Sequence, residues 1–292
     1  MGKSDLKVSA VGLGTGFRGG ITQNSHKVIE AALDLGVTLI DTAEIYEDGQ
    51  SEKLVGQVIK DRRDEVVLVT KVSGDHLRYV DVLKAAEGSL KRLSVDYIDL
   101  YLVHWPNTKV PLSETMRAME TLVNQGKIRY IGVSNFDATT LKEARQELSR
   151  HEIIADEVKY NLMETDIEKD ALPYCQKESI GIITYGSLAR GLLTGRFTDE
   201  SDISEGDWRR QDWFFKGENF ANALQMVKVL KEIGKKYEKT PGQIAINWLL
   251  SKPMVTPIFG ASSVEQVKEN CGAVGFEYVS TMGDQQIYRK RK

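Results

Sequence analysis

The chain alternates between short apolar runs rich in β-branched residues and longer segments in which apolar residues recur with a helical period. The short runs predict eight buried strands, at Ala10–Gly14, Thr38–Asp41, Val66–Lys71, Ile98–His104, Ile128–Ser134, Ile153–Tyr160, Ile180–Tyr185 and Val255–Ile258. The segments between them predict amphipathic helices, for example at Ser25–Leu35, Ser51–Lys60, Tyr79–Leu93 and Leu112–Gln125. Fully buried strands separated by helices are typical of a parallel sheet.

Eight strand–helix units in 292 residues predict an α/β fold of the closed (β/α)8 TIM barrel type, whose usual length is roughly 250 residues. We expect a single domain over residues 1–292, because no proline-rich or serine-rich linker interrupts the pattern. Helix starts carry suitable caps, such as Asp137 and the pair Thr240-Pro241. The polar and aromatic stretch at about 194–220 predicts a long loop after the seventh strand.

Four chemically versatile residues stand at or just beyond the ends of predicted strands: Asp41, Tyr46, Lys71 and His104. Because the carboxyl ends of parallel strands meet at one rim of a barrel, we expect these side chains to converge there and form a catalytic mouth. Taken singly, each has a simpler explanation: Asp41 can cap a turn, and a lone histidine is more often a satisfied interior residue.

A second interpretation comes from Gly14–Gly19, which has the spacing G-x-G-x-x-G after an apolar run, with Asp41 about twenty residues further on. This spacing is typical of a dinucleotide-binding Rossmann unit, in which the helix begins inside the glycine loop. Here the residues GGITQNS intervene before the helical pattern begins, and the Rossmann interpretation gives no role to Lys71 or His104. The barrel is therefore the preferred prediction.

Composition narrows the function classes. Apolar residues make up 41% and charged residues 28% of the chain, and the formal net charge is −3, which gives no electrostatic case for binding nucleic acid. No apolar stretch approaches a membrane span, and the first residues lack the apolar region of a secretory signal, so we expect no membrane association and a cytoplasmic protein. Cys175 and Cys271 are far apart and predict two free thiols rather than a disulfide or a metal site.

Several motifs, in order, resemble those of the aldo-keto reductases. They are GLGT at Gly12–Thr15, DTAEIY at Asp41–Tyr46, TK at Thr70-Lys71, DYIDLYLVHWP at Asp96–Pro106, GKIRYIGVSNF at Gly126–Phe136, YNL at Tyr160–Leu162 and SLARGLLTG at Ser187–Gly195. The stretch EGDWR followed by FKGE is similar to the bacterial and archaeal branch that includes inositol-utilisation and general stress reductases. The resemblance spans essentially the whole chain and implies the same barrel.

The resemblance implies NADPH-dependent reduction of aldehydes or ketones to alcohols, with a small-molecule carbonyl as substrate. Reduction of a carbonyl needs a proton donor at the oxygen, and Tyr46 is the natural general acid. We expect the Lys71 ammonium to lower the pKa of this phenol, and Asp41 to keep the lysine charged and oriented. We expect His104 to donate a hydrogen bond to the substrate oxygen, with a proton relay through its imidazole as the alternative.

The resemblance also implies a set of cofactor contacts. They are Gly14, Thr15, Asp41, Ser134, Asn135, Glu157 and Tyr185 at the nicotinamide end; Ser187, Leu188, Arg190, Gly191, Leu193 and Arg196 at the pyrophosphate; and Gly260, Ser262, Gln266, Glu269 and Asn270 at the adenosine half.

Two departures bear on these contacts. Glu157 stands where many relatives carry glutamine, and an ionised carboxylate accepts hydrogen bonds but cannot donate them. Ser262 and Ser263 stand where relatives that select the 2′-phosphate often carry a cation, so NADP(H) is the expected cofactor and NAD(H) the alternative. A second function also stays open, because the family includes channel subunits and lens proteins: a nicotinamide-nucleotide-binding regulatory or structural protein with little turnover.

Overall fold

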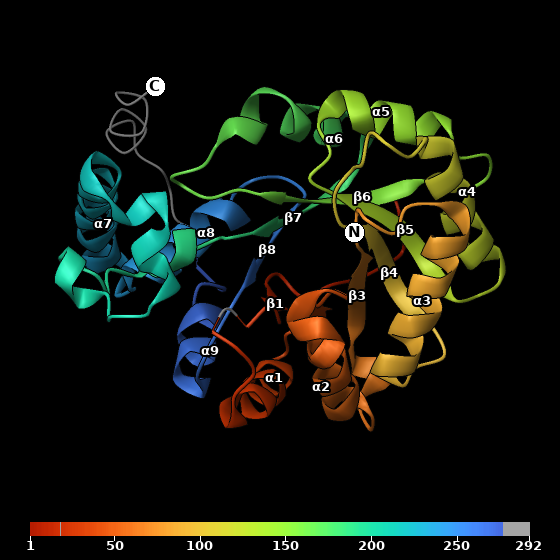
Figure 1. Cartoon of the computed structure of the whole chain (residues 1–292). Coiled ribbons are helices and arrows are strands. Elements are labelled where there is room, and N and C mark those ends of the chain that lie inside the picture. The colour runs from red at the N-terminus through yellow and green to blue at the C-terminus, as the bar shows by residue number, and fades with distance from the viewer. Residues whose placement is uncertain (18, 277–292) are drawn as a thin grey trace.

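The computed structural model describes residues 1–17 and 19–276, and in this part of the chain eight parallel strands close into a barrel in the order β1 to β8 (Figure 1). The strands are β1 (Gly12–Gly14), β2 (Leu39–Asp41), β3 (Val67–Val72), β4 (Ile98–Val103), β5 (Ile128–Ser134), β6 (Ile153–Lys159), β7 (Gly181–Tyr185) and β8 (Val255–Phe259). The prediction of a (β/α)8 barrel is confirmed. A closed barrel also excludes the open sheet that the Rossmann interpretation requires.

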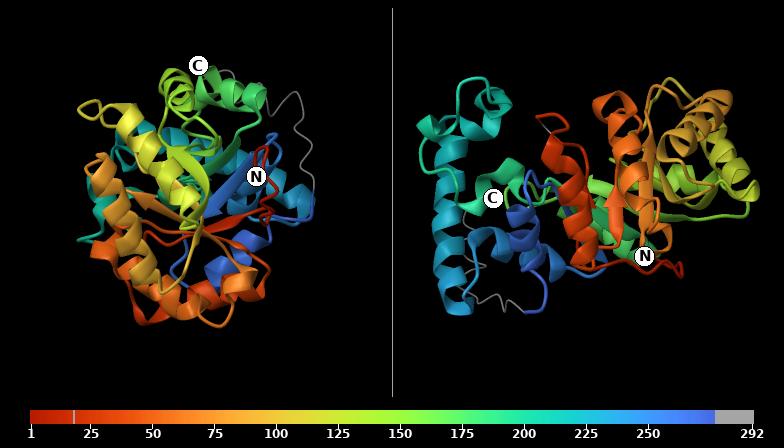
Figure 2. Two further views of the ribbon diagram at one scale, coloured as in Figure 1. Left: turned by 90° about the vertical axis from the view of Figure 1, so that its right-hand side faces the viewer. Right: turned by 90° about the horizontal axis from the view of Figure 1, so that it is seen from below.

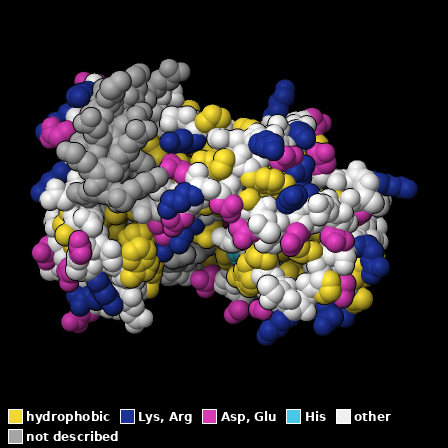
Figure 3. Space-filling model, turned by 90° about the horizontal axis from the view of Figure 1, so that it is seen from above, with side chains coloured by type: hydrophobic (Ala, Val, Ile, Leu, Met, Phe, Trp, Pro, Cys, Tyr) yellow, Lys and Arg dark blue, Asp and Glu magenta, His cyan; other side chains and the backbone are white. Residues whose placement is uncertain are grey.

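Helices connect the strands and surround the barrel. They are α1 (Gln23–Asp34), α2 (Gln50–Ile59), α3 (Tyr79–Leu93), α4 (Leu112–Asn124), α5 (Ala138–Gln146), α6 (Ala171–Glu178), α7 (Gly217–Tyr237), α8 (Pro241–Leu250) and α9 (Val264–Cys271). Two of them lie between β7 and β8. Helix α8 packs against β8 and α9, whereas α7 packs on α8 at the edge of the molecule, outside the ring (Figure 2). Seen from above, the outline is indented between the end that carries α7 and the rest of the barrel (Figure 3).

Two apolar layers hold the barrel together. Every residue of β3 and β4 is buried, as expected for strands with side chains packed on both faces. Leu39, Val69, Leu100 and Leu102 belong to a cluster inside the barrel, and the helices bury a larger apolar layer against its outer face. The polar side chains of the mouth therefore stand on a rigid, water-excluding base.

The segment predicted as a long loop is more ordered than expected. It contains three short 3-10 turns, at Glu200–Asp202, Trp208–Gln211 and Trp213–Phe215, and α7 already begins at Gly217. Phe214 and Phe215 are buried in a second core, together with residues of α7 and α8. Burial of these aromatic side chains explains the order. The sequence showed a polar and aromatic stretch without a period, which does not reveal that the aromatic side chains share a core.

Element boundaries differ slightly from prediction. Strand β1 begins at Gly12 rather than at residue 10, and β6 ends at Lys159 rather than at residue 160. The predicted helix caps are confirmed: the Asp137 side chain accepts a hydrogen bond from the N–H of Thr140 at 2.7 Å, and Thr240 forms a capping box ahead of α8. Within residues 1–17 and 19–276, no helix is both long and apolar enough to cross a membrane.

Candidate active site

The four predicted catalytic residues lie at the carboxyl end of the barrel. Asp41 is the last residue of β2, Lys71 is the penultimate residue of β3, and His104 directly follows β4. Tyr46 opens a short 3-10 turn after β2. The structure therefore brings together residues from three neighbouring strand ends, as the sequence predicted.

Lys71 is the centre of this group and its side chain is fully buried. Its Nζ lies 2.5 Å from Asp41 Oδ1 and donates a hydrogen bond of 3.0 Å to the carbonyl oxygen of Thr42. A second carboxylate oxygen, Glu157 Oε2, lies 3.3 Å away. The predicted pairing of Lys71 with Asp41 is present, and it supplies the partner that a buried ammonium requires.

Tyr46 and His104 complete the group from the solvent side. Lys71 Nζ lies 5.2 Å from the centre of the Tyr46 ring, and the Tyr46 and His104 rings meet edge to face with centroids 5.7 Å apart. The indole of Trp105 packs beside the imidazole, with ring centroids 4.8 Å apart. The phenol, ammonium and imidazole thus share one small volume.

The pKa of Tyr46 differs from the expectation. We expected Lys71 to lower it, but burial of the phenol raises the pKa of Tyr46 above its ordinary value, and the Asp41 and Glu157 charges act in the same direction. Lys71 opposes this shift without overcoming it. The phenol is therefore protonated at neutral pH. The Lys71 charge makes the pKa of Tyr46 lower than it would be for an equally buried phenol without a neighbouring cation, but not lower than that of tyrosine in water.

Burial, with a smaller contribution from the Lys71 charge, lowers the pKa of His104 to about 3. The imidazole is therefore neutral at any ordinary pH and has one N–H to donate. Its Nδ1 is buried and has no hydrogen-bond partner among the described residues. A neutral imidazole suits a hydrogen-bond donor better than a proton relay.

Glu157 was predicted only as a cofactor contact, and its place beside Lys71 was not expected. It lies in β6, and like Asp41 it is almost fully buried. Burial is the largest cause that raises the pKa of each carboxyl, and the neighbouring Asp41 charge raises that of Glu157 further. The sequence feature that could have predicted this place is an acidic residue, Glu157, within the predicted buried strand IIADEVK.

The predicted nicotinamide contacts form a row beside this group. Tyr185 Oη donates to Asn135 Oδ1 at 2.8 Å, and Asn135 Nδ2 donates to the carbonyl oxygen of His104 at 3.0 Å. Ser134 Oγ donates to the Glu157 carbonyl oxygen at 2.8 Å. Asn135 has the left-handed φ of 61°, a conformation that concentrates at functional sites.

Gly14 and Thr15 lie at the opposite side of the mouth, at the end of β1. Thr15 is buried, and its hydroxyl donates to the Asp41 carbonyl oxygen at 2.8 Å and contacts Ser51 Oγ at the same distance. This places both residues within the same rim. Residue 18, part of the glycine-spaced motif, lies outside the described residues.

The predicted pyrophosphate contacts follow β7. Three successive residues, Ala189, Arg190 and Gly191, have φ values of 46°, 59° and 91°, so this turn holds an unusual left-handed conformation. Arg190 Nε lies 2.5 Å from Asp212 Oδ2, and its Nη1 lies 3.4 Å from Glu164 Oε2. The sequence did not indicate these two carboxylate partners, because Asp212 comes from the segment predicted as a loop.

The other members of this group differ in accessibility. Ser187 is buried, with Oγ 2.8 Å from the Ile258 carbonyl oxygen, and Leu193 is fully buried in the second core. Leu188 is half-buried, and the Arg196 side chain is exposed. Contacts of Ser187 and Leu193 with a ligand would therefore have to involve mainly their backbone.

The predicted adenosine contacts lie after β8 and along α9. The amide oxygen of Gln266 accepts hydrogen bonds from Ser262 N at 2.9 Å and Ser262 Oγ at 3.2 Å. A Cβ atom at Gly260 would meet no atom within 4 Å, so the chain is open there. Glu269 is half-buried and Asn270 buried. The residues predicted to contact the adenosine half lie near those predicted to contact the pyrophosphate, because Ser187 donates a hydrogen bond to Ile258 of β8.

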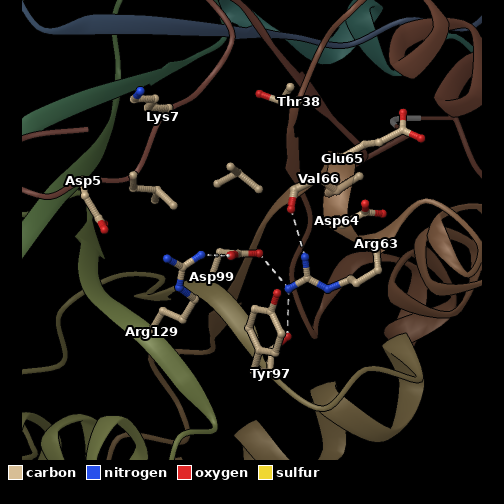
Figure 4. A pocket seen from close by; sticks show the side chains of 12 residues that line it. Asp5, Lys7, Thr38, Arg63, Asp64, Glu65, Val66, Tyr97, Asp99 and Arg129 are labelled. Atoms are coloured by element: carbon tan, nitrogen blue, oxygen red, sulfur yellow. Dashed lines mark hydrogen bonds and ion pairs between the residues drawn. The ribbon is translucent and has the colours of Figure 1, made fainter.

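A cavity of about 260 Å³ lies at the other end of the barrel, where the strands begin (Figure 4). Arg63 and Arg129 point toward Asp99 from opposite sides of it, and Tyr97 lies below. None of the predicted site residues lines this cavity. Among the described residues, no three histidine, cysteine, aspartate or glutamate side chains are grouped so that they could hold a metal ion.

Comparison with known proteins gives one family. The family model described as "Aldo/keto reductase family" matches residues 10–285. Aldo-keto reductase YhdN of Bacillus subtilis is 41% identical over 265 residues, covering 85% of this chain and 79% of the relative. Methylglyoxal reductase YeaE of Escherichia coli is 34% identical over 279 residues, covering 94% and 89%. A putative voltage-gated potassium channel subunit beta of Schizosaccharomyces pombe is 34% identical over 303 residues, covering 94% and 87%.

Solved structures of aldo-keto reductases are also similar to this chain. The thermostable aldo-keto reductase Tm1743, in complex with the inhibitor epalrestat, superposes with a TM-score of 0.83 at 38% identity, covering 99% of this chain and 97% of that one. An aldo-keto reductase from Klebsiella pneumoniae in complex with NADPH gives a TM-score of 0.79 at 34% identity, covering 97% and 91%.

Proposed function

This chain belongs to the aldo/keto reductase family and is an oxidoreductase, and from this premise we propose that it uses NADPH to reduce aldehydes or ketones to alcohols. In this proposal Tyr46 is the general acid, Lys71 and Asp41 support it, and His104 orients the substrate. The observation that carries the proposal is the buried Lys71 ammonium, paired with Asp41 and 5.2 Å from the centre of the Tyr46 ring.

The chain's own groups meet the needs of the reaction. When bound, NADPH would supply the hydride for the carbonyl carbon, and the carbonyl oxygen needs a proton from the protein. Tyr46, protonated at neutral pH, gives the proton of its hydroxyl to that oxygen, and the tyrosinate that remains is stabilised by the Lys71 charge. The neutral His104 donates an N–H to the same oxygen and fixes the carbonyl beside Tyr46.

The residues of the mouth fit a dinucleotide. The row of Ser134, Asn135 and Tyr185 offers amide and hydroxyl groups in the mouth, and at Gly260, where a Cβ atom would meet no atom within 4 Å, the backbone can be approached closely. The relative crystallised with NADPH shares this barrel. We propose that Arg196 and, after exchange of its carboxylate partners, Arg190 meet the phosphates.

A second candidate function comes from one relative. The Schizosaccharomyces pombe protein is named a putative potassium channel subunit, and its similarity covers 94% of this chain. In such a role the nucleotide would bind and remain without rapid turnover. The reductase named for methylglyoxal, at the same 34% identity, points instead to a small reactive carbonyl as substrate.

The decisive experiment follows oxidation of NADPH by its absorbance, with a panel of aldehydes that includes methylglyoxal. We expect turnover, and we expect Tyr46→Phe to lower kcat by about 10²–10⁴-fold, the usual contribution of a positioned general acid. Affinity for NADPH, followed by quenching of protein fluorescence, should stay within about threefold, because the hydroxyl is proposed to act on the substrate oxygen.

Two results would count against this function. Undiminished turnover in the phenylalanine variant would remove Tyr46 as the acid. Tight binding of NADPH without oxidation by any carbonyl of the panel would favour the regulatory role.

A further inference from the structure

The charge balance around Lys71 is uneven. One ammonium faces two carboxyl groups, Asp41 at 2.5 Å and Glu157 at 3.3 Å, and all three side chains are at most a few percent exposed. If both carboxyls were ionised, a net negative charge would be buried inside the barrel, which is costly when solvent cannot reach it. Two neighbouring carboxylates in one site usually resolve this by keeping one proton.

Geometry indicates which carboxyl keeps the proton. Asp41 receives the short hydrogen bond from Lys71 and is the natural anion of the pair. Glu157 Oε2 lies further from the ammonium and meets no hydrogen bond of suitable geometry among the described residues. The Glu157 carboxyl also faces that of Asp41, so a proton on Glu157 has an acceptor at hand.

We propose that Glu157 acts in the proposed reductase reaction as a neutral carboxylic acid, a positioning residue whose ionisation weakens Tyr46 as a proton donor. The inference rests on the proposed function. It extends that function by naming a residue that sets the upper pH limit of catalysis and that acts through Lys71 rather than by touching the substrate.

The surroundings of Glu157 support this role. The charged and titratable groups that face it are Asp41 from β2, Tyr46 from the turn after β2 and Lys71 from β3. Its partners in the neighbouring strands, Ser134 in β5 and Ile183 in β7, carry no charge. The next lysine along β6, Lys159, pairs with Glu164 at 2.8 Å and not with Glu157. No second cation therefore offsets the excess carboxyl within this described group.

The effect on Tyr46 follows from charge. A tyrosinate is stabilised by the Lys71 cation and opposed by each nearby anion, and both Asp41 and Glu157 raise the pKa of Tyr46 when charged. Burial, together with the Asp41 charge, raises the pKa of Glu157 to about 8. Below that pH the site holds one cation and one anion, and above it a second anion opposes proton release.

The test compares the wild-type protein with Glu157→Gln, which keeps the shape of the side chain and cannot ionise. Single-turnover oxidation of bound NADPH by a saturating aldehyde is measured between about pH 6 and pH 10, across the titration of Glu157. We expect the wild-type rate to fall about tenfold or more over this range, and the Glu157→Gln rate to fall less than about threefold from its own value at pH 6. The matched control is Glu120→Gln. Glu120 is a buried glutamate of α4 whose carboxylate accepts hydrogen bonds from the N–H groups of residues 149–151. This variant should keep the wild-type decline in rate.

Thermal unfolding gives a readout that needs no turnover. Because Glu157 binds its proton more tightly when folded than when unfolded, its stabilising contribution is complete below the unfolded pKa and is lost as pH rises through the folded pKa. The wild-type melting temperature should therefore fall relative to that of Glu157→Gln as the pH rises from about 5 to 9.

The outcomes separate the inference from the function on which it rests. Matching pH profiles for wild type and Glu157→Gln, each taken relative to its own rate at pH 6, would overturn the neutral-acid role. Absence of wild-type turnover at pH 6 would instead overturn the reductase function, and the difference in melting temperature would still decide the protonation state of Glu157.

Discussion

The two ends of the barrel solve the same electrostatic problem in different ways. Where the strands begin, Asp99 is almost fully buried, and its two oxygens accept hydrogen bonds from Arg63 at 2.7 Å, Arg129 at 3.0 Å and the N–H of Leu68 at 3.0 Å (Figure 4). Where the strands end, the single cation Lys71 faces two carboxyls. The cluster of Asp99, Arg63 and Arg129, called the lower cluster from here on, has more cations than anions. The cluster of Lys71, Asp41 and Glu157 in the mouth has fewer.

The two clusters differ in which atoms are left without a hydrogen-bond partner. In the lower cluster the buried Arg63 Nε has none among the described residues, but the same guanidinium donates to the carbonyl oxygens of Val66 and Tyr97 and to Asp99. Asp99 has donors on both oxygens, and the arginines reach toward solvent, where excess charge is hydrated. In the mouth, Glu157 Oε2 and His104 Nδ1 are buried without hydrogen-bond partners among the described residues. Buried polar groups are normally satisfied, and in the mouth the two exceptions lie on a residue proposed to contact the substrate and on one that contacts Lys71.

Removing the cation of the mouth should have the largest effect. Lys71→Met leaves two buried carboxyls without a counter-charge and removes the group that stabilises tyrosinate, so we expect kcat to fall by about 10³-fold or more. We also expect a loss of about 3 kcal/mol or more in the free energy of unfolding near pH 8, measured by urea denaturation, with part of it recovered at lower pH as the carboxyls take up protons. Activity within tenfold of wild type would show that Lys71 serves the fold alone.

Removing the anion of the lower cluster should affect stability without affecting chemistry. Asp99→Ala leaves two arginines without their shared partner, and we expect the free energy of unfolding to fall by about 3 kcal/mol, the low end for a broken buried pair because the arginines reach solvent. The kcat measured well below the melting temperature should stay within about twofold of wild type. A kcat that falls together with stability would show that the two ends of the barrel are coupled, and the separation of a structural cluster from a catalytic one would then be wrong.

The smallest effect is expected from the outer arginine of the lower cluster. The Arg129 side chain is 45% exposed, and Asp99 keeps its other donors when it is removed. Arg129→Ala should therefore cost less than about 1 kcal/mol in urea denaturation, as for an exposed ion pair. A loss as large as that of Asp99→Ala would mean that the two arginines act as one unit.

The sequence predicted the barrel and the convergence of Asp41, Tyr46, Lys71 and His104, because both follow from local patterns. Apolar periodicity marks the strands, and the geometry of parallel strands places their ends on one rim.

Properties that depend on depth and on distant partners were beyond the sequence. The direction of the pKa shift of Tyr46 depends on whether burial or the Lys71 charge dominates, which is set by the depth of the phenol in the folded barrel. The pairing of Arg190 with Asp212 joins two segments across a turn whose path no local pattern encodes. The contact between Glu157 and Lys71 crosses the barrel interior between strands that are not neighbours.

That last contact gives Lys71 a mechanical role. From its place on β3 the ammonium reaches Asp41 on the adjacent strand and Glu157 on β6, with two strands intervening along the wall. The ammonium therefore links the ends of three strands across the mouth, and moving these strand ends apart would require its ion pairs with Asp41 and Glu157 to break. A substitution at Lys71 would therefore remove two things together, the charge proposed to stabilise tyrosinate and the link between the ends of β3 and β6.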